Sequence, residues 1–263
     1  MQGKVESEGK RKKVILVDVT RNTIEYRVFG RYALFSDPIC RMGGEKLSYP
    51  VPTYQALKGI TESIYWKPSI LWRIDAVRVL NPIRTENKSI RPISYTGQSN
   101  TLSVYTYLVN PVYEVRAHFI PNPYRSEPDV IADGQNENKH HCIAKRMVKK
   151  GGRRDIFLGT RECQAYVEPC EYGRERSFYQ ESGTVDLGVM FHSFIYADES
   201  KQEQGQLGVR LWHATMTGGE IRFLAPEECD PAMCRMIRPM VPKKFGKKYQ
   251  NFSAGPEGEE VDR

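Results

Sequence analysis

The stretch TYQALKGITESIYWKPSILWRIDAVRVL, residues 53–80, predicts a helix followed by a strand. Thr53 is a good N-cap, and Pro68 ends the helix. Between them, three apolar residues fall on one helix face: Leu57, Ile60 and Ile64. The apolar run over residues 70–80 then predicts a strand. The other elements can be ordered around this helix–strand unit.

Further elements are expected on both sides of this unit: a strand over 23–29, a strand over 112–120, a helix with Asn138 as its N-cap and Gly151-Gly152 as its stop, and a strand over 164–168. The order strand, helix, strand, strand, helix, strand is typical of an α+β fold. It predicts a ferredoxin-like (RRM-like) βαββαβ domain over residues 22–172, with spatial strand order 4-1-3-2 and antiparallel helices on one face. Polar or loop-rich connections are expected at residues 30–52, 84–100 and 121–137.

The rest of the chain predicts a small antiparallel β-sheet domain over residues 173–225. Its expected strands cover residues 187–196, 207–216 and 220–224. Thr217-Gly218-Gly219 suits a hairpin turn between the last two of them. Residues 1–21 form a polar N-terminal extension in this interpretation. Residues 226–263 form a Pro- and charge-rich C-terminal tail, and we expect its last part to be disordered.

The composition indicates a soluble globular protein with a polyanionic partner. The 263 residues carry a formal net charge of +7, and the pI is near 9.0. Between residues 139 and 176 there are ten Lys/Arg and five Asp/Glu, a local excess of +5. No apolar run is long enough to cross a membrane, so we expect a cytoplasmic protein. Six cysteines without C-x-x-C spacing indicate free thiols, mostly buried, rather than a metal site or cofactor.

The predicted topology brings Tyr65 and the pair Lys139-His140 to one end of the domain. Helix one ends at Tyr65-Trp66-Lys67, and helix two begins at Lys139-His140. Because the two helices are expected to be antiparallel, the end of the first should lie beside the start of the second. Three side chains that are distant in sequence therefore form one candidate catalytic site.

These residue types suit cleavage of RNA without a metal, because RNA supplies its own nucleophile in the 2′-hydroxyl. His140 has an ordinary pKa of about 6.5 and can act as base or acid. Its place in the first turn of a helix favours the neutral base form. Lys139 can stabilise negative charge on the phosphorane oxygens. Tyr65 is a poor base at its ordinary pKa of about 10 and a better donor or positioning group. The sequence leaves open which of Tyr65 and His140 is the acid and which the base.

Basic residues around this site form a candidate RNA-binding set: Arg153, Arg154, Arg161, Lys46, Lys67, Lys145 and Lys149. Three of them belong to a loop in which Gly151, Gly152 and Gly159 flank the arginines. Such a loop can give phosphates both guanidinium and backbone contacts. Because it continues directly from the helix that carries Lys139 and His140, we expect it to bind the substrate. A solvent-exposed loop without a ligand is the alternative. His118, His192 and His213 are expected to be structural, and His141 is a possible substitute for His140.

Four stretches of the sequence together resemble one known family: residues 29–35 (FGRYALF), 43–49 (GGEKLSY), 52–59 (PTYQALKG) and 151–163 (GGRRDIFLGTREC). They are similar to the Cas-five proteins of subtype I-C CRISPR systems, the "d" or Dvulg form, within the RAMP superfamily. The resemblance runs from about Ile24 to Cys229. It implies a ferredoxin-like N-terminal domain and a small β-sheet C-terminal domain.

The resemblance also implies a function and a site. Family members cut precursor CRISPR RNA within each repeat, at the base of its stem-loop, without a metal ion. They then stay on the 5′ handle of the guide RNA beside the backbone and large subunits of a type I-C Cascade complex in antiviral defence. The family's catalytic Tyr matches Tyr65, and its Lys-His pair matches Lys139-His140. The leading hypothesis is therefore an endoribonuclease that acts by 2′-OH attack. The alternative is a noncatalytic subunit that binds the guide-RNA handle.

Overall fold

The computed structural model describes residues 22–36, 45–91, 102–197, 199 and 205–241. Its main element is a nine-stranded sheet, and the class is mixed α+β. Two helices that pack on this sheet, α1 (Tyr54–Ile64) and α3 (Glu137–Lys149), are those expected from the sequence. Within this part of the chain, no helix is both long and apolar enough to span a membrane.

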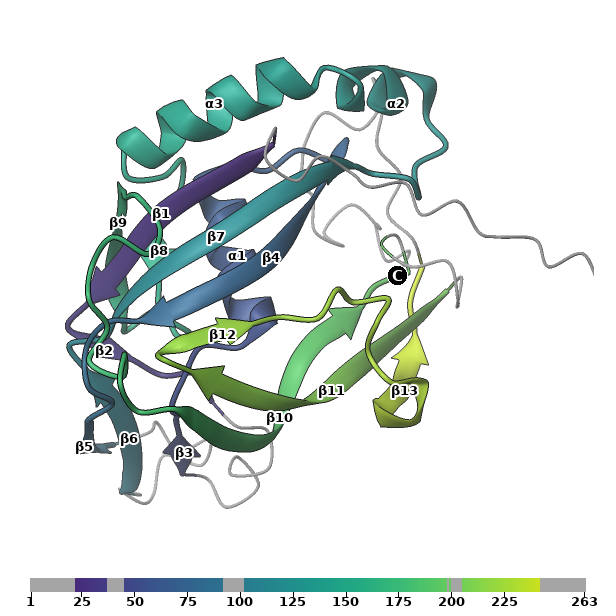
Figure 1. Ribbon diagram of the computed structural model, residues 1–263. Helices are drawn as coiled ribbons and strands as arrows, with labels where there is room; N and C mark the ends of the chain where they lie inside the picture. Colours follow the sequence, from purple (N-terminus) through teal and green to yellow (C-terminus); the bar gives the residue numbers. More distant parts are fainter. Residues whose placement is uncertain (1–21, 37–44, 92–101, 198, 200–204, 242–263) are drawn as a thin grey trace, which may run out of the picture.

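Four strands form the centre of the sheet in the order β9-β1-β7-β4 (Figure 1). Their bounds are Thr23–Gly30 for β1, Ile70–Val79 for β4, Val112–Pro121 for β7 and Gln164–Pro169 for β9. All three neighbouring pairs are antiparallel. Counted along the chain, this is the predicted 4-1-3-2 order. The buried residues of β1 alternate as the sequence pattern predicts, with Ile24, Tyr26 and Val28 facing the core.

The features of the sequence that predict the first helix, its N-cap and its apolar stripe, also stabilise it in the structure. The side chain of Thr53 accepts a hydrogen bond from the Ala56 N–H at 3.2 Å and so caps the helix. The apolar stripe Leu57, Ile60 and Ile64 is buried against the sheet. The Tyr26 hydroxyl lies 2.7 Å from Thr61 Oγ1, which joins β1 to the middle of this helix. The packing fixes where the C-terminal end of α1 lies.

The C-terminal strands extend the main sheet instead of forming a separate one. Three strands, β10 (Thr184–Ile195), β11 (Gln206–Thr217) and β12 (Glu220–Arg222), pair in sequence order. β12 then pairs with β4, with Ile221 opposite Val77. The three strands are antiparallel as predicted, but a separate sheet was expected, and the sequence pattern did not indicate this continuity with the main sheet. Ile221 is 1 % exposed, so its burial beside β4 contributes to the shared core.

Several elements lie in segments where the sequence predicted loops or a tail. A second sheet contains β2 (Tyr32–Ala33), β3 (Lys46–Leu47), β5 (Thr85–Ile90) and β6 (Ser103–Val109). Two further strands are β8 (Ile156–Phe157) and β13 (Cys234–Pro239), which pairs with β11 after a 3-10 turn at Pro231–Met233. The strand β5 is TENKSI, whose polar composition conceals its pairing with β6.

Two predictions near the second helix are also wrong. The segment 121–137 contains a short helix, α2 (Pro128–Gly134), where a turn-rich loop was expected. The second helix, α3, begins at Glu137 with Asn136 as its N-cap, so the predicted cap, Asn138, lies inside the helix. Pro128 supplies the fixed φ that suits the first residue of α2. The two helices follow each other almost directly, and Figure 1 shows α2 next to the start of α3.

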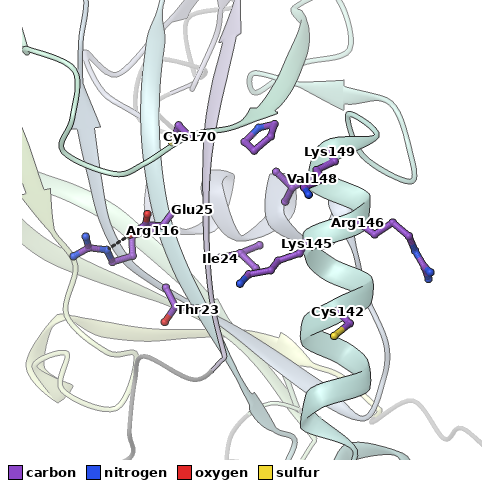
Figure 2. Close-up of a pocket in the computed structure, with 11 residues that line it drawn as sticks. Thr23, Ile24, Glu25, Arg116, Cys142, Lys145, Arg146, Val148, Lys149 and Cys170 are labelled. Carbon is purple, nitrogen blue, oxygen red and sulfur yellow. Dashed lines mark hydrogen bonds and ion pairs between the residues drawn. The ribbon is translucent and has the colours of Figure 1, made fainter.

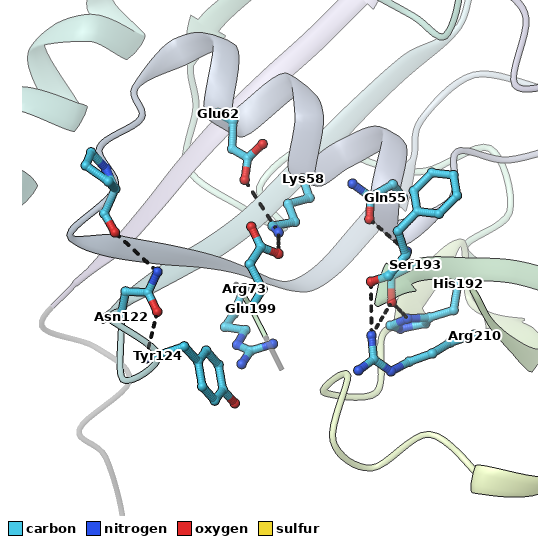
Figure 3. A network of polar contacts seen from close by, with 12 residues as sticks. Gln55, Lys58, Glu62, Arg73, Asn122, Tyr124, His192, Ser193, Glu199 and Arg210 are labelled. Atoms are coloured by element: carbon cyan, nitrogen blue, oxygen red, sulfur yellow. Dashed lines mark hydrogen bonds and ion pairs between the residues drawn. The ribbon is translucent and has the colours of Figure 1, made fainter. Parts of the chain in front are cut away.

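A polar network joins α1 to the C-terminal strands (Figure 3). Lys58 lies between Glu62, at 3.5 Å, and Glu199, with which it forms a closer ion pair. The Gln55 side chain accepts a hydrogen bond from the Phe194 N–H at 3.2 Å. Next to them His192 stacks on Tyr54, with ring centroids 4.4 Å apart. These contacts hold β10 against α1.

Protonation of His192 is expected to destabilise the fold. Burial lowers the pKa of His192 to about 4, so the unfolded chain takes up a proton below pH ~6.5 that the folded chain does not. The contribution of neutral His192 to the free energy of unfolding is complete above pH ~6.5. It falls by roughly 3 kcal/mol as the pH approaches the pKa of His192 in the folded protein. Chemical unfolding between pH 7 and 4.5 should show a shallower loss in His192→Gln than in the wild type. Equal losses in the two proteins would contradict this assignment.

The cysteines are only in part as expected. Cys142, Cys163, Cys170, Cys229 and Cys234 are free thiols. Two of these five, Cys163 and Cys229, are buried, so the prediction that most would be buried is wrong for this set. Cys40 lies outside the described residues.

Candidate active site

Tyr65 and His140 are in direct contact. The Tyr65 hydroxyl oxygen lies 2.7 Å from Nδ1 of His140. Tyr65 is the C-cap residue of α1, and His140 closes the first turn of α3. The two side chains are 2 % and 0 % exposed. The end of the first helix therefore lies beside the start of the second, as the predicted topology requires.

The hydrogen bonds of His140 determine its tautomer. Nε2 of His140 lies 2.9 Å from the main-chain oxygen of Asp133. A carbonyl oxygen only accepts, so Nε2 must carry a proton. In the neutral imidazole Nδ1 is then bare, and it accepts the hydrogen bond from the Tyr65 hydroxyl. Tyr65 is the donor of this pair.

Lys139, the third residue of the predicted catalytic site, is linked to His140 through Asp133. The Lys139 ammonium lies 2.8 Å from Oδ1 of Asp133, and the other carboxylate oxygen accepts a 2.7 Å hydrogen bond from the Ser69 hydroxyl. That oxygen is also 3.5 Å from Nε2 of His140. Burial alone would raise the pKa of Asp133, but the hydrogen bonds from Lys139 and Ser69 outweigh it and lower this pKa. Asp133 is therefore a carboxylate at neutral pH, and the sequence analysis missed it.

The environment of Tyr65 keeps its hydroxyl protonated. Burial, with the negative charge of Asp133, raises the pKa of Tyr65 to about 12, against the opposing effect of Arg153. At neutral pH Tyr65 is a hydrogen-bond donor and not a tyrosinate. The Trp72 indole N–H donates a hydrogen bond to the Tyr65 carbonyl at 2.7 Å, which fixes the backbone of Tyr65.

The glycine-arginine loop has a structural role that the sequence did not predict. The backbone N–H groups of Arg153 and Arg154 donate to the Ser63 carbonyl at 3.2 and 3.1 Å, and Arg153 N–H also lies 3.2 Å from the Ile64 carbonyl. These bonds satisfy carbonyls at the C-terminal end of α1. The expected backbone contacts to phosphate are therefore wrong for these two residues. Both arginine side chains are exposed, and Arg153 acts electrostatically on Tyr65.

Gly159 is likewise structural. It has φ +96°, and a Cβ at this position would lie 1.9 Å from the Leu34 carbonyl oxygen. Beside it, the Leu34 N–H donates to the Leu158 carbonyl at 3.0 Å. Only glycine fits this close approach of two backbones.

A groove of about 1030 Å³ lies on the other side of α3, between this helix and the start of β1 (Figure 2). β9 pairs only with Tyr26–Gly30, so it stops short of this part of β1. Figure 2 shows Lys145 extending from α3 towards Ile24. Lys145 and Lys149 line the groove, and they are two of the predicted RNA-binding residues. Arg146 also lines the groove, as does Arg116, which forms an ion pair with Glu25, so the cations there outnumber the one carboxylate.

The other predicted RNA-binding residues do not join this groove. Lys46 belongs to β3 in the second sheet, where its ammonium lies 4.6 Å from the centre of the Tyr105 ring. Figure 1 shows β3 at the opposite end of the molecule from α3. Lys67 follows α1, and Arg161 is exposed between β8 and β9. The predicted set is thus spread over several surfaces.

The remaining histidines have local partners. His118 Nδ1 lies 2.7 Å from Asp75, and His213 Nε2 lies 3.3 Å from Asp186. His192 donates to the Leu224 carbonyl at 3.1 Å. His141, the possible substitute for His140, donates to the Thr23 carbonyl at 2.9 Å. No group of three or more metal-ligating side chains occurs in the described part of the chain.

A protein-family model for Cas5d, described as CRISPR-associated protein (Cas_Cas5), matches residues 23–224. The chain belongs to the Cas5d family. This region contains Tyr65, Lys139 and His140 as well as both helices that carry them. The resemblance seen in the sequence motifs is therefore confirmed at the level of the family.

Two curated relatives carry the name CRISPR pre-crRNA endoribonuclease Cas5d. The protein from Mannheimia succiniciproducens is 46% identical over 201 residues, which cover 66% of this chain and 86% of the relative. The protein from Thermus thermophilus is 30% identical over 186 residues, which cover 67% of this chain and 75% of the relative. A solved CRISPR-associated protein is 35% identical with a TM-score of 0.65, covering 81% of this chain and 96% of the other. The two curated relatives thus resemble this chain in sequence, and the solved CRISPR-associated protein resembles it in fold.

Proposed function

We propose that this Cas5d protein is an endoribonuclease that cleaves precursor CRISPR RNA within the repeat, at the base of its stem-loop, by attack of the 2′-hydroxyl. The observation that carries the proposal is the 2.7 Å hydrogen bond from Tyr65 to His140, with Lys139 as the next residue. A hydroxyl, an imidazole and an ammonium are the groups that this reaction needs. The names of the two curated relatives support the same substrate.

The tautomer of His140 suggests a direction for the proton. The 2′-hydroxyl gives its proton to the Tyr65 oxygen while Tyr65 gives its own proton to Nδ1 of His140. The 2′-oxygen then bonds to phosphorus, and the bond from phosphorus to the 5′-oxygen breaks. The imidazolium then returns its proton through the Tyr65 hydroxyl to the departing 5′-oxygen, so that one proton moves in all from the 2′-oxygen to the 5′-oxygen. The products are a 2′,3′-cyclic phosphate and a 5′-hydroxyl, and Tyr65 never has to exist as a free tyrosinate.

Two cations are placed to stabilise the phosphate during this step. Lys139 is exposed and pairs with Asp133, so its ammonium is available to an RNA phosphate that competes with this carboxylate. Arg153 is exposed beside Tyr65, and its backbone is fixed by α1. Both cations act where negative charge develops on the phosphorane oxygens.

The groove beside α3 is the proposed binding site for single-stranded RNA next to the cleavage site. Its floor includes the apolar residues Ile24, Val148 and Pro169, and its rim is basic. Apolar surface suits exposed bases, and the basic rim suits the phosphates. Product held there would remain bound as the 5′ handle, beside the backbone and large subunits of a type I-C Cascade complex.

Two finer assignments belong to the same proposal. The strand order 4-1-3-2 and the two helices support a ferredoxin-like core over residues 22–172. The strands of residues 173–225 form the proposed second domain, although their pairing with β4 makes the sheet continuous. Residues 1–21 and most of the proposed tail at 226–263 lie outside the described residues.

A cleavage assay tests the proposed function directly. The full chain is incubated with the repeat RNA of its own CRISPR array in excess EDTA, beside an RNA of equal length with an unpaired stem. We expect one cut at the base of the stem-loop in the repeat and none in the control. Binding without any cleavage would favour the alternative, a noncatalytic subunit that binds the handle. Cleavage that EDTA abolishes would contradict the metal-independent mechanism.

Neutralising the groove should weaken RNA binding and reduce its salt dependence. The double variant Lys145→Gln/Lys149→Gln removes two cations from the rim. For single-stranded RNA each lost phosphate contact reduces the slope of log K against log salt by about 0.7, so the pair should reduce it by about 1.4. Filter binding at several salt concentrations measures this slope. Lys150→Gln removes an exposed cation from the same helix end outside the groove, and an equal effect there would contradict the assignment.

A further inference from the structure

We propose that Asp133 is a positioning residue of this site, which orients His140 and holds Lys139 for the reaction. The inference rests on the proposed function, because it assigns a role within that catalytic step. Asp133 contacts both members of the Lys139-His140 pair, and it does so through two different groups. One group is its main-chain carbonyl and the other is its carboxylate.

The carbonyl of Asp133 fixes the imidazole. Because it accepts from Nε2 of His140 at 2.9 Å, the proton is held on the nitrogen that faces away from Tyr65. If that proton moved to Nδ1, the imidazole could no longer accept the proton of the Tyr65 hydroxyl. The order of contacts is therefore Asp133, His140, Tyr65. A base is oriented by a third group while it activates a hydroxyl.

The carboxylate of Asp133 supplies charge. When His140 accepts a proton it becomes an imidazolium, and the nearest carboxylate oxygen of Asp133 is 3.5 Å from Nε2. In a buried site, this negative charge interacts with the imidazolium more strongly than it would at the same distance in water. The same carboxylate holds the Lys139 ammonium at 2.8 Å, on the exposed side of the site. One residue thus supports both the base and the cation.

The backbone around Asp133 is built for this placement. The Ser69 hydroxyl donates to its carboxylate at 2.7 Å. The next residue, Gly134, packs so closely on Ser69 that a Cβ would lie 2.7 Å from the Ser69 carbonyl oxygen. A larger residue at 134 would push the end of α2 away from β4 and move the Asp133 carbonyl with it. The position of Asp133 therefore depends on contacts at the start of β4.

Single-turnover and steady-state cleavage of repeat RNA by Asp133→Asn test this role. We expect kcat to fall about 10-fold to 100-fold, the range seen when a residue that orients a functional side chain is removed. KM should not rise, because the variant loses a negative charge next to the phosphate. Asp129→Asn removes the same charge from an exposed position of α2 and should leave both constants unchanged. A wild-type kcat in Asp133→Asn, or an equal loss in Asp129→Asn, would overturn the inference.

Two further measurements separate positioning from a loss of folding and from failure of the proposed function. Ser69→Ala keeps the charge of Asp133 but releases its carboxylate, and should lower kcat less than Asp133→Asn does, with an unchanged Tm. Nitrogen NMR of labelled histidine, with His140 assigned through His140→Gln, reads the tautomer without any RNA. We expect the proton on Nε2, and a proton on Nδ1 of the neutral ring would overturn the inference. If the wild type does not cleave repeat RNA, the proposed function fails, while the NMR result still decides the contact with Asp133.

Discussion

Replacing His140 with alanine is expected to slow cleavage of repeat RNA by about 10³-fold, because general acid–base catalysis by one side chain contributes about 10² to 10⁴. The variant removes the acceptor of the Tyr65 hydroxyl proton at 2.7 Å. Tyr65 cannot replace it, since its pKa of about 12 keeps it protonated near neutral pH. Single-turnover cleavage with enzyme in excess measures the rate.

The controls for this prediction separate chemistry from folding and binding. His140 is 0 % exposed, so alanine also leaves a cavity, and thermal unfolding must show that the variant is folded at the assay temperature. RNA affinity should change little, because the surrounding cations remain. His141→Ala is the matched variant: it removes the neighbouring imidazole, which bonds the Thr23 carbonyl and not Tyr65. Equal losses of rate in the two variants would contradict the role of His140.

Replacing Gly159 with alanine is expected to lower the free energy of unfolding by about 4 kcal/mol, among the larger effects of single substitutions. The new Cβ would lie 1.9 Å from the Leu34 carbonyl oxygen, and the backbone has φ +96°. Neither the clash nor the strain can be relieved by a side-chain movement, because both partners are backbone. Chemical denaturation measures the change.

Gly59→Ala is the control for this substitution. Gly59 lies inside α1, and a Cβ there would meet nothing within 4 Å. Alanine at this position should stabilise the protein by about 0.5–1 kcal/mol, because it favours the helix over the unfolded chain. If Gly159→Ala is as stable as the wild type, the loop is not held against Leu34 as described. The glycine would then be free for the phosphate contact that the sequence suggested.

The parts of this molecule that follow from local pattern were predictable. The helix stripe of α1 and the alternation in β1 predicted both elements, and the order of elements predicted which ends of the two helices meet. The predicted topology places Tyr65 beside His140, and the 2.7 Å contact between them agrees with it. Burial of an apolar stripe determines such features, and the stripe is visible in the sequence.

The parts that depend on contacts between distant backbones were not predictable. Asp133 lies in a segment whose composition predicts a polar turn. Its contact with His140 depends on the next residue, Gly134, which packs closely on Ser69. The one signal in the sequence was an acidic residue shortly before a Lys-His pair. Arg153 and Arg154 read as phosphate ligands, whereas their N–H groups complete the hydrogen bonding of α1. A sequence shows which residues carry charge, but it does not show which backbone groups are already bonded.

We propose that the site containing Tyr65, Lys139 and His140 cleaves RNA through the RNA's own 2′-hydroxyl. The most direct measurement uses repeat RNA with a single 2′-deoxynucleotide immediately before the cut, compared with the all-ribose RNA under the same conditions. We expect the deoxy substrate to bind equally well and to stay intact, while the ribose substrate yields a 2′,3′-cyclic phosphate and a 5′-hydroxyl. Cleavage of the deoxy substrate at the same position, or products with a 3′-hydroxyl and a 5′-phosphate, would contradict this proposal.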